Sequence, residues 1–442
     1  MKKTSLIAGL ALVAGFGVAF AQVNAGGNLV PNAPLVTSIG PNDAFQDVVN
    51  GFPQAQSYYA PSALLGGYGA TLAGGNYDNA LIGGDFSTNL FQRGTSVSLT
   101  SSTYYVAYGA DRWFSWGGTS TPATMTKQTA AADIPVGATA SYRINKGSLT
   151  GVLQICTSQV IESANAVRFQ GQTVEFTFDA KAGSTFSAAS SNLAVYVSTG
   201  TVADEGATYM AYGLNAQGGA GTTAWTGQVN AGGTGGYLIP ITTSWARYGV
   251  AVPIPANALE IGVSICYTPV GTGTSTDWFE FAKAQFTTNP AVTTFAGTAG
   301  AIYPLGDTRM KAFARRAIEI ETALQQRYAY SVTEPAANIA VGLQGQSAST
   351  TLCSLMLQFP VTMRIAPTFS VFGSTALSAS TWKINQAAQN LALATTYLVT
   401  LVGNSPNAAL LTATTAASQT AGWGCQLVGA AGGNVLGWSA EL

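Results

Sequence analysis

Short apolar runs of strand length, separated by turns rich in Gly, Ser and Thr, constrain the fold of this 442-residue chain more than any other feature. Between Ala80 and Pro290 such runs recur, and no helical period interrupts them. Four of them are Gly151–Thr157, Thr173–Phe178, Leu193–Val197 and Tyr248–Val252. Many short strands without helices are typical of a β-sandwich or a jelly roll. We therefore expect a jelly-roll domain over residues 79–290.

The stretch Asn79–Thr95 is the most specific sequence in the chain, and Gly109–Trp113 forms a second cluster after it. Ala80–Ile82 predicts a short apolar strand, and the two glycines and aspartate that follow predict a sharp turn. Apolar anchors and a closing polar turn complete the unit: Phe86, Leu90, Phe91, then Gln92-Arg93-Gly94.

These two stretches resemble the opening of a β-sandwich module that is common in virion proteins of tailed phages. The module begins with asparagine-glycine-aspartate-phenylalanine, reaches tryptophan-glutamine-arginine-glycine, and continues into alanine-aspartate-arginine-tryptophan. Here Gly84 replaces the usual asparagine-glycine pairing, and Phe91 stands where tryptophan is usual. The resemblance implies a jelly roll similar to carbohydrate-binding modules.

Further stretches extend the resemblance over residues 79–442. They are Gln159–Glu162, Gly171–Lys181, Thr243–Tyr248, Thr276–Glu280, Arg327-Tyr328 and Phe359–Arg364 with Pro367-Thr368. The resemblance implies a structural protein on the virion surface, such as a capsid decoration protein, a head fibre or a tail-fibre-like appendage.

The sequence between Tyr303 and Tyr330 predicts one helix, with Asp307 as its N-cap. Its apolar residues recur at steps of three and four and would form one face: Phe313, Ala317, Ile320, Leu324 and Tyr328. We assign residues 291–330 to a linker with this helix. Strand-like runs then return, among them Leu355–Phe359, Val361–Val371 and Thr396–Val402, so we expect a second β domain over residues 331–442.

The N-terminal 78 residues contain two different segments. Residues 1–22 are signal-like, with Lys2-Lys3, an apolar run and Ala19-Phe20-Ala21 at a cleavage-like position. A cleaved signal, an uncleaved apolar arm buried in an assembly, and a membrane tether all stay open, and we favour the buried arm. Residues 23–78 are rich in Pro and Gly without a persistent period, so we expect an extended arm that attaches to other virion proteins.

The charge content excludes several functions. Charged residues make up 8% of the chain, against roughly a quarter in ordinary soluble domains, which suggests a place in an assembly or outside the cell. The formal net charge of −1 provides no basic surface for nucleic acid. Histidine is absent from the sequence, which excludes Ser-His-Asp catalysis and the usual imidazole-based zinc sites. No pair of carboxylates suggests a glycosidase, so we expect no enzymatic activity.

Four cysteines leave two alternatives. In an exported chain, Cys156–Cys266 and Cys353–Cys425 are the natural disulfides. In a chain that folds in a bacterial cytoplasm, all four are buried thiols that pack as small apolar groups. We favour the thiols.

Candidate binding residues come from the densest aromatic cluster, which comprises Tyr104, Tyr105, Tyr108, Trp113, Phe114 and Trp116. Exposed rings can stack on sugars, whereas alternating aromatics on strands usually form the core. We assign Trp113 to the core and take Tyr105 and Trp116 as candidate carbohydrate contacts. Asp85 and Asp277 could together bind a structural Ca²⁺, but turn capping by Asp85 and a surface position for Asp277 are the simpler interpretation, so we expect no cofactor.

Two classes of function remain. The first is the virion protein described above, associated as a homo-oligomer, a trimer by analogy, with adhesion to host-surface glycans as its task. The second is a secreted or cell-surface bacterial lectin or adhesin, which the signal-like N-terminus favours.

Overall fold

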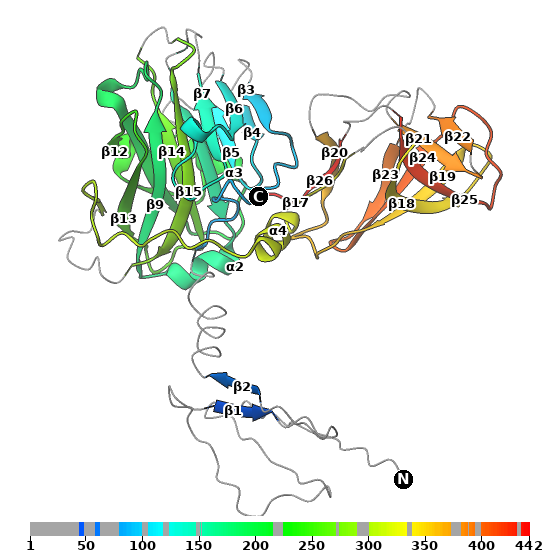
Figure 1. Cartoon of the computed structure of the whole chain (residues 1–442), viewed down its shortest axis with the longest axis horizontal. Coiled ribbons are helices and arrows are strands. Elements are labelled where there is room, and N and C mark those ends of the chain that lie inside the picture. Colours follow the sequence, from blue (N-terminus) through cyan, green and yellow to red (C-terminus); the bar gives the residue numbers. More distant parts are fainter. Residues whose placement is uncertain are drawn as a thin grey trace, which may run out of the picture. The chain divides into compact units, whose positions relative to one another are not determined.

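The structure is a computed structural model. It describes residues 44–47, 58–61, 79–99, 105–117, 123–146, 151, 153–214, 224–270, 274–289, 300–333, 338–372, 382–387, 389–393, 399–430 and 435–442. The chain divides into two compact units, Met1–Asp78 and Asn79–Leu442. In the first unit, strands β1 (Ala44–Asp47) and β2 (Tyr58–Pro61) pair antiparallel (Figure 1). The signal-like segment 1–22 and the rest of the predicted arm 23–78 lie outside the described residues.

The second unit begins with a sandwich of two seven-stranded antiparallel sheets (Figure 1). Sheet 1 has the order β11-β10-β14-β8-β5-β4, with β12 also paired to β10, and sheet 2 has the order β16-β13-β9-β15-β7-β6-β3. Sheet 1 contains β4 (Tyr105–Tyr108), β5 (Phe114–Gly117), β8 (Ile155–Ile161), β10 (Asn192–Gly200), β11 (Val229–Ala231), β12 (Tyr237–Pro240) and β14 (Glu260–Tyr267). Sheet 2 contains β3 (Ser96–Leu99), β6 (Ala123–Gln128), β7 (Ser141–Asn145), β9 (Thr173–Ala182), β13 (Ala246–Pro253), β15 (Trp278–Thr288) and β16 (Ala301–Ile302).

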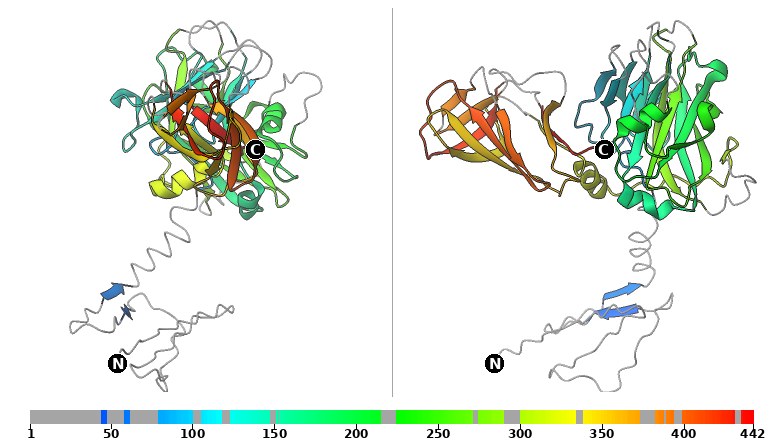
Figure 2. Two further views of the ribbon diagram at one scale, coloured as in Figure 1. Left: turned by 90° about the vertical axis from the view of Figure 1, so that its right-hand side faces the viewer. Right: turned by 180° about the vertical axis from the view of Figure 1, so that it is seen from behind.

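The main core lies between the two sheets. Val195 and Val263 of sheet 1 pack in one cluster with Phe176 and Val250 of sheet 2. Sheet 1 also has a buried outer face, which explains why every residue of β14 is buried although successive side chains point to opposite faces. Helix α3 (Ala207–Leu214) covers that outer face and contributes Met210 to a second cluster (Figure 2). The shorter helices are α2 (Ser163–Ala166) and the 3-10 turns η2 (Ala131–Asp133), η3 (Val167–Phe169), η4 (Ala189–Ser191) and η5 (Gly233–Gly235).

The predicted helix over residues 303–330 is wrong for its first half. Helix α4 spans only Ile318–Gln326, and residues 303–317 form no helix. Buried side chains of β9 and β15 in sheet 2 form hydrogen bonds with the backbone of that segment instead. Glu175 accepts the N–H of Lys311 at 3.1 Å, and the amide of Gln285 binds Ala312 O and Ala314 N. Asp307 caps no helix, because its carboxylate pairs with Arg309.

The C-terminal residues form the expected second set of strands (Figure 1). A three-stranded sheet has the order β17-β26-β20, and a seven-stranded sheet has the order β22-β21-β25-β18-β19-β24-β23. The small sheet contains β17 (Ala329–Thr333), β20 (Thr368–Phe372) and β26 (Val435–Ser439). The large sheet contains β18 (Ala340–Ser347), β19 (Leu352–Gln358), β21 (Trp382–Gln386), β22 (Gln389–Ala392), β23 (Val399–Asn404), β24 (Ala408–Thr414) and β25 (Gly424–Gly429).

The large C-terminal sheet buries one face and exposes the other. Buried and exposed residues alternate along β19, where Leu355 and Leu357 are buried while Met356 is exposed. The buried face packs with Trp438 of β26 in a single cluster. The predicted fold class, mainly β with a jelly-roll sandwich, a joining helix and a second β domain, is confirmed. No helix among the described residues is long and apolar enough to span a membrane.

Both pairs of cysteines form disulfides, so the favoured prediction of four thiols is wrong. Cys156 and Cys266 are directly opposed on β8 and β14. Cys353 and Cys425 join β19 to β25, the two strands that flank β18. These are the pairings that the export alternative predicted. Disulfides are typical of proteins that fold in oxidising compartments.

Candidate functional site

The stretch Asn79–Thr95 forms no strand at Ala80–Ile82, which corrects the sequence prediction. Buried side chains bind the backbone of this stretch directly. The amide of Gln159 on β8 accepts the N–H of Ile82 and donates to its carbonyl, both at 2.7 Å. The amide oxygen of Asn79 accepts the N–H of Leu81 at 3.0 Å. The backbone groups are therefore satisfied without a ladder of hydrogen bonds.

Two glycines in this stretch are required by their surroundings. Gly83 has φ +69°, a left-handed conformation that favours glycine. At Gly84 a Cβ would lie 2.5 Å from the carbonyl oxygen of Ala284 on β15. The predicted sharp turn is thus packed against sheet 2, which leaves no room for a side chain at Gly84.

Asn89 joins the stretch to the second cluster, Gly109–Trp113. It is 5% exposed, and its amide nitrogen donates to the carbonyls of Gly83 (3.0 Å) and Asp111 (3.1 Å). Its amide oxygen accepts the N–H groups of Phe91 and Asp111, each at 3.0 Å. Every hydrogen-bonding group of this side chain is satisfied, so Asn89 fixes the distance between the two clusters.

Helix α4 binds the same stretch through polar residues. Its buried residues are Glu321 and Gln325, one turn apart on one face, instead of the predicted apolar set. Glu321 accepts the N–H of Gly83 and pairs with Arg316 at 2.7 Å. Gln325 accepts the N–H of Leu90 at 2.8 Å and donates to the carbonyl of Thr88 at 3.2 Å.

The polar turn Gln92-Arg93 binds the small C-terminal sheet. The Gln92 amide donates to the carbonyl of Ala329 at 2.6 Å and accepts the N–H of Ser331 at 2.9 Å. Arg93 donates to the hydroxyl of Ser439 at 3.2 Å and lies 3.4 Å from a carboxylate oxygen of Glu441. We call the following set the signature network: Asn79, Asn89, Gln92, Arg93, Asp111, Arg112, Arg316, Glu321, Gln325 and Glu441.

Asp111 and Arg112 are the charged centre of the signature network. Burial raises the pKa of the Asp111 carboxyl to about 6, although Arg93 and Gln92 act in the opposite direction. Arg112 pairs with Glu441 and donates to the carbonyl of Val160 at 2.6 Å. Asp111 is fully buried and Arg112 is 2% exposed, so neither can reach a substrate. Their role is therefore structural, and it extends beyond a single turn.

The structure places the aromatic residues of the predicted cluster in different environments. Trp113 is fully buried beside Phe86 and Phe281, which confirms its assignment to the core. Trp116 is also fully buried, in the cluster under α3, and its indole N–H donates to Ser158 at 3.1 Å. A ring in that position offers no face to a sugar, and we therefore withdraw Trp116 as a carbohydrate contact. Tyr105 begins β4, but its side chain lies outside the described residues.

The two carboxylates considered for Ca²⁺ have separate partners. Asp85 pairs with Arg315 at 2.5 Å, and Asp277 lies 3.7 Å from Lys146 while it accepts two hydrogen bonds from Ser187. Asp277 is also fully buried, which contradicts the surface position we expected. In the described part of the chain, no group of three or more acidic or cysteine side chains could hold a metal ion.

A cleft of about 510 Å³ lies at the edge of the sandwich, between β10 and β11 of sheet 1 and β13 of sheet 2. It is lined by uncharged residues, including Thr199, Val229, Asn230, Tyr237 and Pro255. Val229 is 56% exposed at this cleft. Hydroxyl, amide and backbone groups without a charge suit a neutral polar ligand. Sequence reasoning missed this cleft, because its residues come from four separate stretches that carry no motif.

No protein-family model and no curated protein sequence matches this chain. One similar solved structure is the enzymatically active domain of tailspike protein 4 from bacteriophage CBA120, with 11% identity and a TM-score of 0.26. The match covers 48% of this chain, which spans only 22% of the length of that protein.

Two further structures are carbohydrate-binding modules. A xylan-binding domain from CBM 22 has 12% identity and a TM-score of 0.24, with 43% of this chain and 97% of that chain covered. The tandem CBM22 domains of Paenibacillus barcinonensis Xyn10C have 9% identity and a TM-score of 0.23, with 80% and 89% covered. These TM-scores lie below 0.5, so the likeness carries no inference about ligand or activity.

Proposed function

We propose that this chain is a structural protein of a tailed-phage virion, exposed on the particle surface, that adheres to host-surface glycans. One observation carries the proposal. Three stretches resemble the phage module: Asn79–Thr95, Gly109–Trp113 and Arg327-Tyr328. The third is far from the other two in sequence, yet all three meet in and around the signature network. Convergence of separate matches on one site supports a shared architecture more strongly than any of the matches alone.

In this proposal the chain acts by placement and adhesion, without turning over a substrate. The buried charged residues of the signature network hold the sandwich to the C-terminal strands, which is a mechanical task. The arm 23–78 attaches to other virion proteins, copies associate as a trimer, and the 510 Å³ cleft binds neutral sugar units. Repeated copies turn weak binding at each site into useful avidity.

Electron microscopy of intact particles tests the virion assignment. Gold-labelled antibody against residues 331–442 should mark purified particles at regular positions. Antibody against a cytoplasmic host protein, applied at the same titre, is the control. Particles that carry no label while a blot of the lysate detects the chain would refute the assignment.

The disulfides favour a second candidate, a secreted or cell-surface bacterial lectin or adhesin. Two disulfides fit an oxidising compartment better than a cytoplasmic assembly pathway. The signal-like residues 1–22 point in the same direction. Mass spectrometry of the mature N-terminus separates the candidates: a chain that starts at Gln22 supports export, and one that retains Met1 with the arm inside particles supports the virion protein.

A further inference from the structure

Trp423 is the exposed tryptophan of this chain. All eight tryptophans lie in described residues; the other seven are buried or partly covered, whereas Trp423 is 53% exposed. It lies in the loop between β24 and β25, with glycines on both sides. A Cβ at Gly422 would meet nothing within 4 Å. The ring is therefore accessible and its immediate neighbours leave space beside it.

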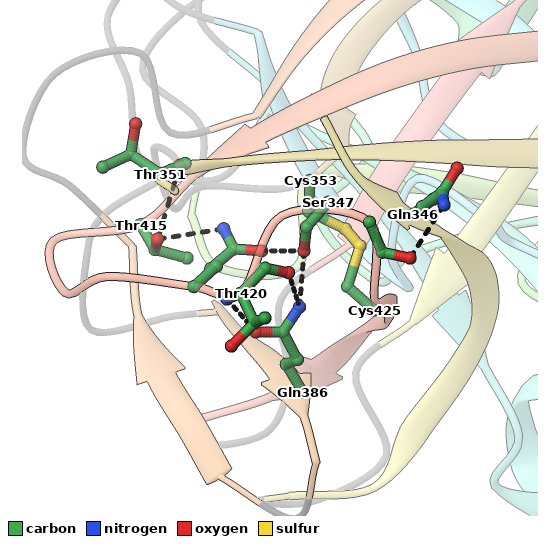
Figure 3. Close-up of a disulfide and its surroundings, with 10 residues drawn as sticks. Gln346, Ser347, Thr351, Cys353, Gln386, Thr415, Thr420 and Cys425 are labelled. Atoms are coloured by element: carbon green, nitrogen blue, oxygen red, sulfur yellow. Dashed lines mark hydrogen bonds between the residues drawn. A yellow bond between two sulfur atoms is a disulfide. The ribbon is translucent and has the colours of Figure 1, made fainter. Parts of the chain in front are cut away.

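The loop that carries Trp423 is held by an extensive buried polar network (Figure 3). Ser347, Gln386 and Gln419 are between 2% and 5% exposed and bind one another through the Ser347 hydroxyl, at 2.5 and 2.6 Å. The Gln386 amide also accepts the N–H of Thr420 at 2.6 Å and donates to its carbonyl at 3.0 Å. A loop that only joined two strands would not need this many satisfied buried groups.

Backbone bonds fix the position of Trp423 itself. Its carbonyl accepts the N–H of Ser347 at 2.9 Å, and the N–H of Gly422 donates to the carbonyl of Ser347 at 2.8 Å. Gln346 donates to the carbonyl of Gly422 at 2.8 Å, and the disulfide at Cys425 follows two residues later. A ring on a rigid loop loses little conformational entropy when it binds a ligand.

The surroundings of Trp423 are polar and uncharged. The loop residues 415–425 and the adjacent residues 346–353 contain Ser, Thr, Gln, Ala and Gly but no acidic or basic side chain. The exposed apolar residues Met356, Val402 and Leu410 belong to β19, β23 and β24, outside this loop. Leu352 is the one aliphatic residue larger than alanine in these two segments, and a single exposed ring makes a poor centre for a protein interface. Hydroxyl and amide groups around an aromatic face instead match the hydroxyls and C–H faces of a neutral pyranose.

We propose that Trp423 is the stacking platform of a second glycan contact, in the C-terminal β domain, for uncharged pyranose units. The inference rests on the proposed adhesive function and adds a site separate from the cleft in the sandwich. Gln346 is exposed, its amide nitrogen donates to the carbonyl of Gly422 beside Trp423, and its amide oxygen is a candidate acceptor for a sugar hydroxyl. Two contacts on one chain would raise the avidity for a polymer over that of either alone.

Native affinity electrophoresis of the full chain tests the site. The gels contain hydroxyethyl cellulose, soluble starch, galactomannan or arabinoxylan, with alginate as the anionic polymer. We expect at least one neutral polymer to retard the wild type and alginate not to. Trp423→Ala should weaken that retardation by about tenfold in apparent affinity, whereas Trp423→Phe should keep part of it. Tyr209→Ala, at another exposed aromatic, and Met356→Ala, in the same domain, are controls that should migrate as wild type.

A second variant separates this site from the cleft. Val229→Trp fills the mouth of the cleft, so residual retardation of that variant reports on Trp423. We expect Val229→Trp to remain retarded and the double variant to lose retardation. The inference fails if Val229→Trp alone abolishes retardation, if Trp423→Ala migrates as wild type, or if no neutral polymer retards the wild type. It also fails if Trp423→Ala changes the sedimentation coefficient, because the ring would then contact another copy. An unchanged thermal midpoint shows that Trp423→Ala folds.

Discussion

The guanidinium of Arg112 lies 3.7 Å from the ring centroid of Tyr328. Arg112 belongs to the sandwich, and Tyr328 follows helix α4, two residues after its last residue. The stacking brings together two stretches that the sequence singled out separately. Arg112 adopts φ +69°, which is unusual for a residue with a side chain and is maintained here by the pairing with Glu441 and Val160.

Loss of Arg112 should destabilise the protein strongly. Arg112→Ala breaks a buried ion pair and leaves Glu441 with Arg93 as its remaining cation. Removal of one partner from a buried pair costs up to about 3–5 kcal/mol. Urea unfolding followed by circular dichroism measures the change. Arg309→Ala is the matched control, since its pair with Asp307 is exposed to solvent and should contribute far less to stability. Equal losses in the two variants would contradict a central role for Arg112.

Glu260 should make the protein less stable as the pH rises. Burial, with help from nearby Glu205 and Asp204, raises the pKa of this carboxyl to about 8. The folded state therefore retains a proton between about pH 4.5 and 8 that the unfolded state has lost, and stability falls with pH across that window. Glu260→Gln should flatten this dependence and gain on the order of 2–3 kcal/mol at pH 9. Thermal midpoints at pH 4, 6, 8 and 9 provide the measurement, and parallel profiles for the two proteins would refute the assignment.

Removal of the C-terminal disulfide should lower stability without changing the fold. The Cys353–Cys425 bond closes a loop with a sequence separation of 72 residues. Its loss in the Cys353→Ser/Cys425→Ser variant should cost about 2–4 kcal/mol, because the unfolded chain gains freedom. Calorimetry with and without reductant checks this: reductant should lower the wild-type midpoint more than that of the variant, which retains only Cys156–Cys266. Free thiols in the untreated wild type would contradict both bonds.

Filling the cleft with a large side chain should weaken glycan binding by the sandwich. Val229→Trp places a large ring at an exposed position on the cleft wall, so neutral oligosaccharides should bind less well while stability stays within about 0.5 kcal/mol. Isothermal titration with neutral oligosaccharides provides the measurement. Val136→Trp, at a position that is 95% exposed and does not line the cleft, is the control. Unchanged binding by Val229→Trp would exclude the cleft as a glycan site.

The strands were predictable because their pattern is local. Thr173–Phe178 and Leu193–Val197 lie within β9 and β10, since runs of apolar residues on strands buried on both sides need no knowledge of the partner. The run Val361–Val371 was only partly right, because β20 begins at Thr368. The domain boundaries at residues 290 and 331 stay predictions.

The remaining differences come from contacts between distant residues. Residues 303–317 form no helix because the side chains of Glu175 and Gln285 bind their backbone. Ala80–Ile82 form no strand because Gln159 binds the backbone of Ile82. None of these three side chains lies in the segment whose backbone it binds. The burial of Trp116 depends on α3, whose helix was not predicted. Trp423 was missed as well, although its flanking glycines were a local sign of an exposed turn.

The docking of α4 through Glu321 and Gln325 has a consequence for how this protein can vary. Hydrogen bonds to Gly83, Leu90 and Thr88 depend on direction as well as distance. One residue inserted between Glu321 and Gln325 would turn the second side chain by about 100° around the helix axis and separate it from its partners. A helix that docks through apolar side chains can repack after such a shift, because apolar contacts depend little on direction. The contact between α4 and the stretch Asn79–Thr95 therefore tolerates changes in the volume of nearby side chains better than any change in the spacing between Glu321 and Gln325.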